Sequence, residues 1–229
     1  LLIKINLIIF FGTILFFYFK FFLENIYLKI FFVIIIIISL GTPAFEWDPR
    51  SIWLFHAKRI FYDQSIFSVI DNYAVFSHND YPNLVPAFAS SIAHLIGHWN
   101  EIFPKLSFTF MFLPPLILTY VFLKDYFYII FLSIVFFIIG KYLFNGWADG
   151  LVAVYFCLSS FLIYKLIISK DYDIEENSSL YVIAFLFFII LTLIKNEGVA
   201  LLTILFLATI FILVCKKQLK QNLSKLLFL

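Results

Sequence analysis

Charged side chains are scarce in this chain of 229 residues: they make up 13% of it, whereas hydrophobic residues make up 64%. The mean hydropathy of +1.04 is too high for a protein whose whole surface faces water. A formal net charge of only +2 provides no basic field that could hold a nucleic-acid backbone, so DNA and RNA are not expected as partners. The composition therefore predicts an integral membrane protein.

Cysteine is also rare, and neither copy has the neighbours of a metal site or a disulfide. Cys157 and Cys215 both lie inside apolar runs without a nearby His or second Cys, which is typical of small hydrophobic side chains. The sequence contains no P-loop, no GxGxxG motif and no Ser, His and Asp order that suggests a hydrolase. Nucleotide binding and hydrolase chemistry therefore have no support here.

Long apolar runs are abundant, and a spanning helix needs about 20 apolar residues. Such runs predict an all-α fold, a polytopic transmembrane bundle of about seven spans near residues 5–22, 28–45, 106–123, 127–144, 151–168, 180–194 and 199–214. The N-terminus has no charged segment or cleavage site of a signal peptide, so residues 1–19 are expected to form a membrane helix or an N-terminally incomplete one. We treat residues 1–229 as one membrane domain, located in the cell (inner) membrane.

The distribution of lysines predicts which loops face the cytoplasm. Residues 215–229 form a basic tail that contains Lys216, Lys217, Lys220 and Lys225. If this tail is cytoplasmic, Lys20 and Lys29 are also cytoplasmic only when segment 84–99 does not cross the bilayer. Segment 84–99 is therefore expected to be re-entrant or juxtamembrane, and residues 42–104 to form one large outer loop.

The predicted outer loop contains an amphipathic helix. Its apolar face is Trp53, Leu54, Ala57, Ile60 and Phe61, and its polar face is Ser51, His56, Lys58, Arg59 and Asp63. Such a face is typical of a helix that lies in the headgroup layer. Pro49 fits the first helical turn, which makes Asp48 the expected N-cap.

Polar residues gather in a few stretches on the predicted outer side. Residues 46–50 and 77–82 lie in the large loop, and Asp149 and residues 195–197 lie in two short outer turns. Ionisable groups at membrane level are unfavourable unless they are paired or functional, so their shared sidedness suggests a site. His78 beside Asp80 could bind a metal, although its surroundings fit a hydrogen-bonded loop histidine better, and His94 with His98 share a helix face.

These polar stretches resemble the motifs of polytopic glycosyltransferases of the GT-C superfamily. The resemblance is to the bacterial branch related to lipid-linked-sugar transferases, protein O-mannosyltransferases and lipid A modifying enzymes. It rests on the order of the segments WDPRSIW at 47–53, AK at 57–58, HNDYPNLVP at 78–86, WNE at 99–101, WADG at 147–150 and KNEG at 195–198.

The resemblance implies inverting transfer of a sugar from a polyprenyl-phosphate-linked donor to a glycan, lipid or protein acceptor on the outer face. Asp48 matches the acid that acts as general base or orients the acceptor, and Asp149 matches the second acid. Lys195 matches a cation for the donor phosphate, with Arg50 and Lys58 as further matches. We assign support of the acceptor or of the loop to His78, Asp80, Tyr81 and Glu197.

The sequence leaves several points open. Some members of the family use a divalent metal and others use none. Residues two apart on a helix point to different sides, so Lys195 is expected to be free of Glu197 and available to a phosphate. The family usually has more spans, so an inactive truncated transferase is one alternative. A non-catalytic membrane scaffold and a transporter subunit are the others.

Overall fold

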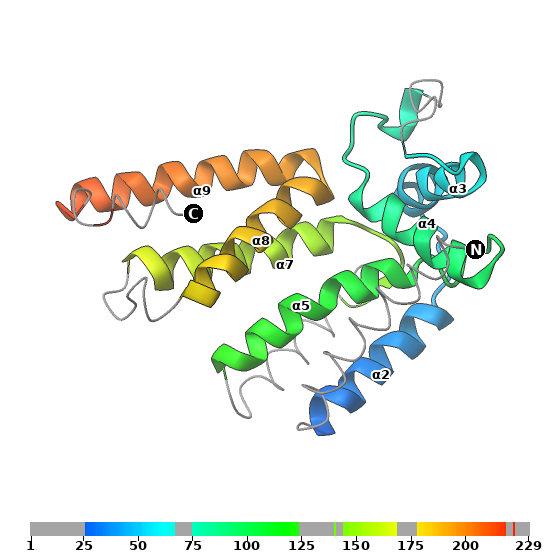
Figure 1. Cartoon of the computed structure of the whole chain (residues 1–229), viewed down its shortest axis with the longest axis horizontal. Helices are drawn as coiled ribbons and strands as arrows, with labels where there is room; N and C mark the ends of the chain where they lie inside the picture. The colour runs from blue at the N-terminus through cyan, green and yellow to red at the C-terminus, as the bar shows by residue number, and fades with distance from the viewer. Residues whose placement is uncertain are drawn as a thin grey trace.

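A computed structural model of the chain describes residues 26–66, 75–123, 144–168 and 178–218, together with Gly140 and Asn222. Seven α-helices and no strand occur among these residues, which confirms the all-α class for the described part (Figure 1). In chain order they are α2 (Ile26–Gly41), α3 (Leu54–Asp63), α4 (Leu84–Ile96), α5 (Leu106–Leu123), α7 (Asp149–Ile163), α8 (Ser178–Ile194) and α9 (Asn196–Cys215). Short turns of other helix types complete the described elements: η1 (Pro49–Trp53), η3 (Val75–Ser77) and η4 (Tyr164–Ile168).

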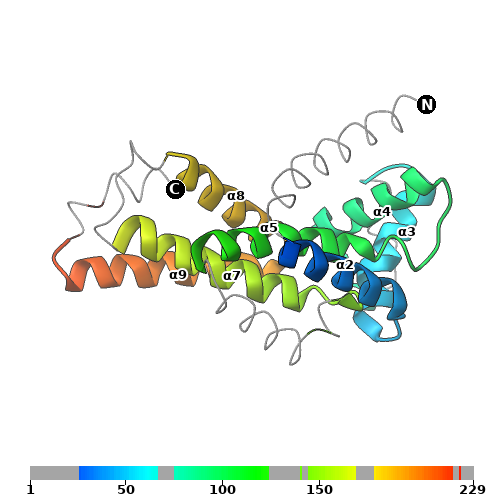
Figure 2. The same cartoon turned by 90° about the horizontal axis from the view of Figure 1, so that it is seen from below.

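The five longest helices form an elongated bundle, and α3 and α4 lie together at one end of it (Figures 1 and 2). Helix α5 contacts α2, α4 and α7, whereas α7, α8 and α9 all contact one another. Aromatic and aliphatic side chains fill the space between them, and Tyr155 of α7 is only 1% exposed. Its hydroxyl donates a 2.8 Å hydrogen bond to the Met111 carbonyl of α5, which satisfies the one polar group of this core residue.

Two described helices are long and apolar enough to cross a membrane: residues 149–167, which comprise α7 and most of η4, and α9. The apolar parts of α2, α5 and α8 are shorter than that, and the expected spans at 5–22 and 127–144 lie outside the described residues apart from Gly140 and Phe144. Helix α9 exposes Leu207 and Phe211 by 61% and 69%. Large apolar side chains exposed along one helix are typical of a surface in contact with lipid or another chain.

Helices α3 and α4 pack face to face at the end of the bundle. Trp53, Leu54, Ala57 and Ile60 are buried, which confirms the predicted apolar face. That face is covered by protein, because α3 and α4 make extensive contacts. The ring centroids of Phe61 on α3 and His94 on α4 lie 4.6 Å apart. The placement of His56 on an exposed polar face was wrong: its side chain is buried, whereas Lys58, Arg59 and Asp63 are exposed.

Helix α4 has 13 residues, from Leu84 to Ile96. At about 1.5 Å per residue it reaches about 20 Å, which is less than the hydrocarbon thickness of about 30 Å. The helix ends at Gly97, whose left-handed φ of +94° suits glycine and turns the chain out of the helix. The Gly97 N–H donates a hydrogen bond to the Ala93 carbonyl.

Candidate functional site

The site begins at the tight connection between α8 and α9. Helix α8 ends at Ile194, and Lys195 is extended, with φ of −157° and ψ of 150°, before α9 starts at Asn196. The first turn of α9 packs so closely on α8 that a Cβ at Gly198 would overlap the Leu191 backbone. This close approach holds the Lys195 backbone in a fixed position between the two helices.

Lys195 forms ion pairs with two carboxylates. Its Nζ lies 2.9 Å from Oδ1 of Asp149, 46 residues earlier in the chain, and 3.3 Å from Oε1 of Glu197. The Lys195 side chain is 11% exposed, whereas Asp149 and Glu197 are 51% and 53% exposed. Both acids lie in the first turn of a helix, α7 and α9, where the helix dipole favours negative charge.

The expectation that Lys195 is free of Glu197 was therefore wrong. The spacing rule for helices does not apply here, because Lys195 precedes the helix and its extended backbone turns the side chain back toward Glu197. Burial by itself lowers the pKa of Lys195, but the hydrogen bond and charge of Asp149, with contributions from Tyr81 and Glu197, raise it above its ordinary value. The ammonium is thus charged at every physiological pH.

Tyr81 covers this ion cluster with its aromatic ring. The Lys195 ammonium lies 5.4 Å from the ring centroid, within cation–π range. The ring stacks on Trp53 at 5.5 Å and on His78 at 4.6 Å, between centroids. Its hydroxyl donates a long 3.4 Å hydrogen bond to Glu197. Burial raises the pKa of Tyr81, and Glu197 adds to this against the opposing effect of Lys195, so the phenol stays a donor.

Asn196 fastens the loop around residue 80 to the start of α9. Its Nδ2 donates to the backbone oxygen of Asp80 at 3.2 Å and to Oδ2 of the same residue at 2.7 Å. His78 Nδ1 lies 3.9 Å from Asp80 Oδ1, at the limit of an ion pair. We call the six residues Asp80, Tyr81, Asp149, Lys195, Asn196 and Glu197 the Lys195 cluster. Three segments far apart in sequence thus meet at one place, as expected if these polar stretches form one site.

Asp48 directly precedes η1, which packs on the turn before Asp149, and its carboxylate forms no ion pair or hydrogen bond with Lys195. Gly146 has a φ of +106°, and a Cβ there would come within 2.9 Å of Pro49 Cβ, so this turn needs glycine to sit against η1. Asp48 is at the N-cap position of η1 and Pro49 in its first turn, as predicted, but the Asp48 backbone is helical and its side chain makes no capping hydrogen bond. Within the described ranges the Asp48 carboxylate has no ion pair.

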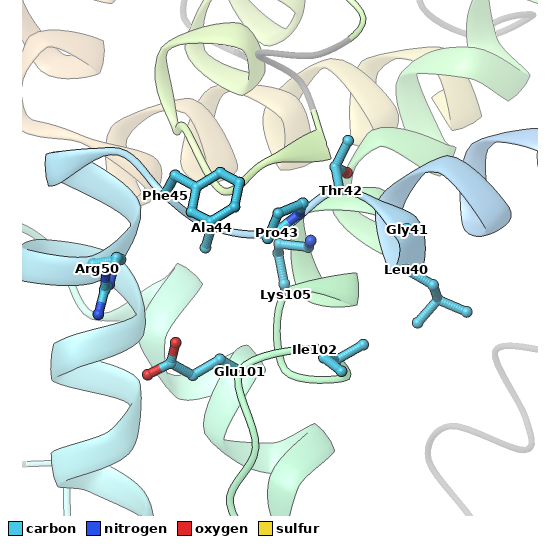
Figure 3. A pocket seen from close by; sticks show the side chains of 10 residues that line it. All are labelled: Leu40, Gly41, Thr42, Pro43, Ala44, Phe45, Arg50, Glu101, Ile102 and Lys105. Carbon is cyan, nitrogen blue, oxygen red and sulfur yellow. The ribbon is translucent and has the colours of Figure 1, made fainter.

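Arg50 and Lys58 lie apart from the Lys195 cluster. Arg50 lines a separate pocket that is bordered by Glu101 and Lys105 (Figure 3). Lys58 is exposed on α3, and neither cation forms an ion pair with another residue of the described segments. The structure therefore brings together Asp149, Lys195, Glu197, Tyr81, Asp80 and His78, and leaves Arg50 and Lys58 outside this group.

The described residues contain no group of three or more His, Cys, Asp or Glu side chains placed to hold a metal ion. His94 contacts the ring of Phe61, which places it in the packing between α3 and α4. The chain shows no match to a known protein family, to a curated protein sequence or to a solved structure.

Two residues that matter to the site were missed by sequence reasoning. Trp53 was noted in an apolar face and in a motif but received no role at the site, yet its ring stacks on Tyr81. Asn196 was part of a noted motif but received no role, although it binds Asp80. Asn196 follows Lys195 in the KNEG segment, and Trp53 is the last residue of WDPRSIW. Their places in these motifs were the signals that could have indicated a role at the site.

Proposed function

We propose that this protein is a polytopic membrane glycosyltransferase of about seven spans. It transfers a sugar from a polyprenyl-phosphate-linked donor to a glycan, lipid or protein acceptor at the outer face of the inner membrane. The observation that carries the proposal is the convergence of the segments at 78–82, 147–150 and 195–198 on one cluster, since these segments also carry the resemblance to GT-C enzymes.

In this proposal Asp48 is the general base. Its carboxylate accepts the proton of the acceptor hydroxyl as that oxygen attacks the anomeric carbon and the donor phosphate departs. The absence of an ion pair to Asp48 in the described chain supports this role, because a base must be open to the acceptor. Its neighbour Pro49 packs on the turn that leads to Asp149, so both acids belong to one region.

Lys195 supplies positive charge for the departing phosphate. A phosphate that approaches Lys195 also meets Asp149 and Glu197, which would repel it. We therefore assign Asp149 to holding the ammonium in place, and propose that the phosphate displaces Glu197, whose contact of 3.3 Å is the longer of the two. Preorganised charge of this kind is often the largest contribution to catalysis.

A non-catalytic scaffold is the second candidate, and the pairing of Lys195 favours it. A lysine that is already bound by two carboxylates and covered by an aromatic ring is what a purely structural tie between α7 and α9 needs. In that case the site holds the bundle together and transfers no sugar.

Transfer by membranes that contain the protein separates these candidates. Labelled polyprenyl-phosphate sugars are supplied to the parent, to Asp48→Asn and to Asp63→Asn, a matched loss of an exposed carboxylate on α3. Loss of a general base is expected to lower the rate about 100-fold or more, whereas Asp63→Asn leaves it unchanged. Transfer by Asp48→Asn within about threefold of the parent removes Asp48 as the base, and no transfer by the parent with any donor supports the scaffold.

A further inference from the structure

Lys105 is a buried cation outside the Lys195 cluster. Its side chain is 1% exposed, and it lies in the connection between α4 and α5, next to the first residue of α5. Its side-chain ammonium makes no hydrogen bond or ion pair with any residue in the described part of the chain. A buried ammonium without a partner is unfavourable, so a fold that keeps one needs a reason for it.

Lys105 borders a pocket of about 390 Å³, a size that suits a small ligand. The pocket lies between the end of α2, η1 and the segment before α5, and Arg50 and Glu101 line its other side (Figure 3). The Lys105 side chain extends toward Pro43, and the rest of the lining includes Leu40 and Ile102 (Figure 3). None of the lining residues belongs to the Lys195 cluster.

The charges of this pocket favour an anion. Two cations and one carboxylate leave a formal charge of +1, and neither Arg50 nor Lys105 lies within ion-pair distance of Glu101. Burial lowers the pKa of Lys105 to about 8, so the ammonium is still mostly charged at neutral pH.

We infer that this pocket binds a phosphate group, as a monoester or diester, between Lys105 and Arg50. Lys105 supplies a buried point charge, and Arg50 supplies a planar set of donors that can hold two phosphate oxygens. The apolar lining on the α2 side suits the carbon atoms next to a phosphate ester. The inference does not rest on the proposed sugar transfer, because the pocket shares no residue with the Lys195 cluster; Arg50, which the resemblance matched to the donor phosphate, lines this pocket instead.

Thermal unfolding of the delipidated full-length protein tests this inference in dodecyl maltoside, a detergent without phosphate. Inorganic phosphate is added against sodium chloride at equal ionic strength, and dihexanoylphosphatidic acid is added against dihexanoylglycerol. We expect at least one of the two phosphates to raise the unfolding temperature of the parent by about 5 °C at saturation. A response to dihexanoylphosphatidic acid alone identifies a lipid source, and a response to inorganic phosphate identifies the free ion.

Variants connect the response to the pocket. Lys105→Met keeps the length of the side chain without its charge and should abolish the shift, whereas Lys216→Met, at the exposed far end of α9, should keep it. Arg50 is exposed, so Arg50→Gln should fold as the parent does and need about fivefold more phosphate for half of the shift. The inference is overturned if neither phosphate shifts the parent, if Lys105→Met responds equally, or, where Lys105→Met does not fold, if Arg50→Gln responds as the parent does.

Discussion

The Nζ atom of Lys195 and Oδ1 of Asp149 lie 2.9 Å apart, although the two residues are 46 positions apart in the chain. This ion pair joins the first turn of α7 to the connection between α8 and α9. It therefore fixes the relative position of two segments that also carry the resemblance to glycosyltransferases. Lys195 is 11% exposed, so the pair is partly shielded from water.

This shielding predicts a measurable coupling between the two residues. In a double-mutant cycle of Asp149→Asn and Lys195→Met, we expect an interaction of about 1 kcal/mol in the free energy of unfolding. The pair Arg59 and Asp63, an i,i+4 contact of 3.4 Å on the exposed face of α3, is the matched control and should give about 0.3 kcal/mol. Equal coupling in the two pairs would show that Lys195 is as solvated as a surface lysine.

The convergence of the Lys195 cluster was partly predictable from the sequence. Charge counting placed Asp149, Lys195 and the loop at 78–82 on one side, and the motif order suggested a common site. The partners themselves were not predictable, because the extended backbone of Lys195 depends on how closely α9 packs on α8 at Gly198. Helical spacing rules cannot anticipate a conformation that tertiary packing imposes.

The positions of Arg50 and His56 show a second limit of prediction from the sequence. The N–H of Leu54 bonds to the Pro49 carbonyl, five residues back, so η1 is a wider turn than an α-helix. This wider turn alters the directions of the side chains. Arg50 lines the pocket that Lys105 borders and does not join Lys195. His56 is buried because the packing of η1, α3 and α4 covers more of α3 than its apolar stripe.

In the proposed sugar transfer, Glu197 should compete with the donor phosphate for Lys195. Glu197→Gln removes one of the two carboxylates that hold the ammonium, so we expect the KM for the polyprenyl-phosphate sugar to fall about twofold to fivefold. Asp149→Asn should not lower it, because Asp149 positions the ammonium. Initial rates over a range of donor concentrations measure both effects. A KM that rises in Glu197→Gln would indicate that Glu197 itself binds substrate.

The ring of Tyr81 should matter more than its hydroxyl. Tyr81→Phe loses only an exposed 3.4 Å hydrogen bond and should unfold within about 0.5 kcal/mol of the parent. Tyr81→Leu loses the stacking on Trp53 and His78 and the contact with Lys195, which should lower the free energy of unfolding by about 1 to 2 kcal/mol. Denaturant unfolding of both variants checks this order, and a reversed order would contradict it.

The sidedness prediction can be tested at two exposed positions on either side of α4. Phe76 and Ile102 are 76% and 51% exposed. Single cysteines at these positions, in a chain where Cys157 and Cys215 are replaced by alanine, should both react with a membrane-impermeant maleimide added outside the cell. Reaction of the two positions from opposite sides would mean that α4 crosses the bilayer, and it would place residues 42–83 in the cytoplasm.

The burial of Lys105 predicts a pH-dependent stability. Its pKa is about 8 in the fold and near its ordinary value of 10.5 in the unfolded chain, so the unfolded chain binds more protons between these values. Its contribution to stability therefore rises with pH from about 8 to 10.5, and below 8 the buried charge is fully unfavourable. Without added phosphate, Lys105→Met should unfold at a higher temperature than the parent at pH 7, and this difference should shrink as the pH rises toward 10. A difference that is constant over this range, measured with Lys216→Met as the control, would show that the Lys105 ammonium is as well solvated in the fold as in the unfolded chain.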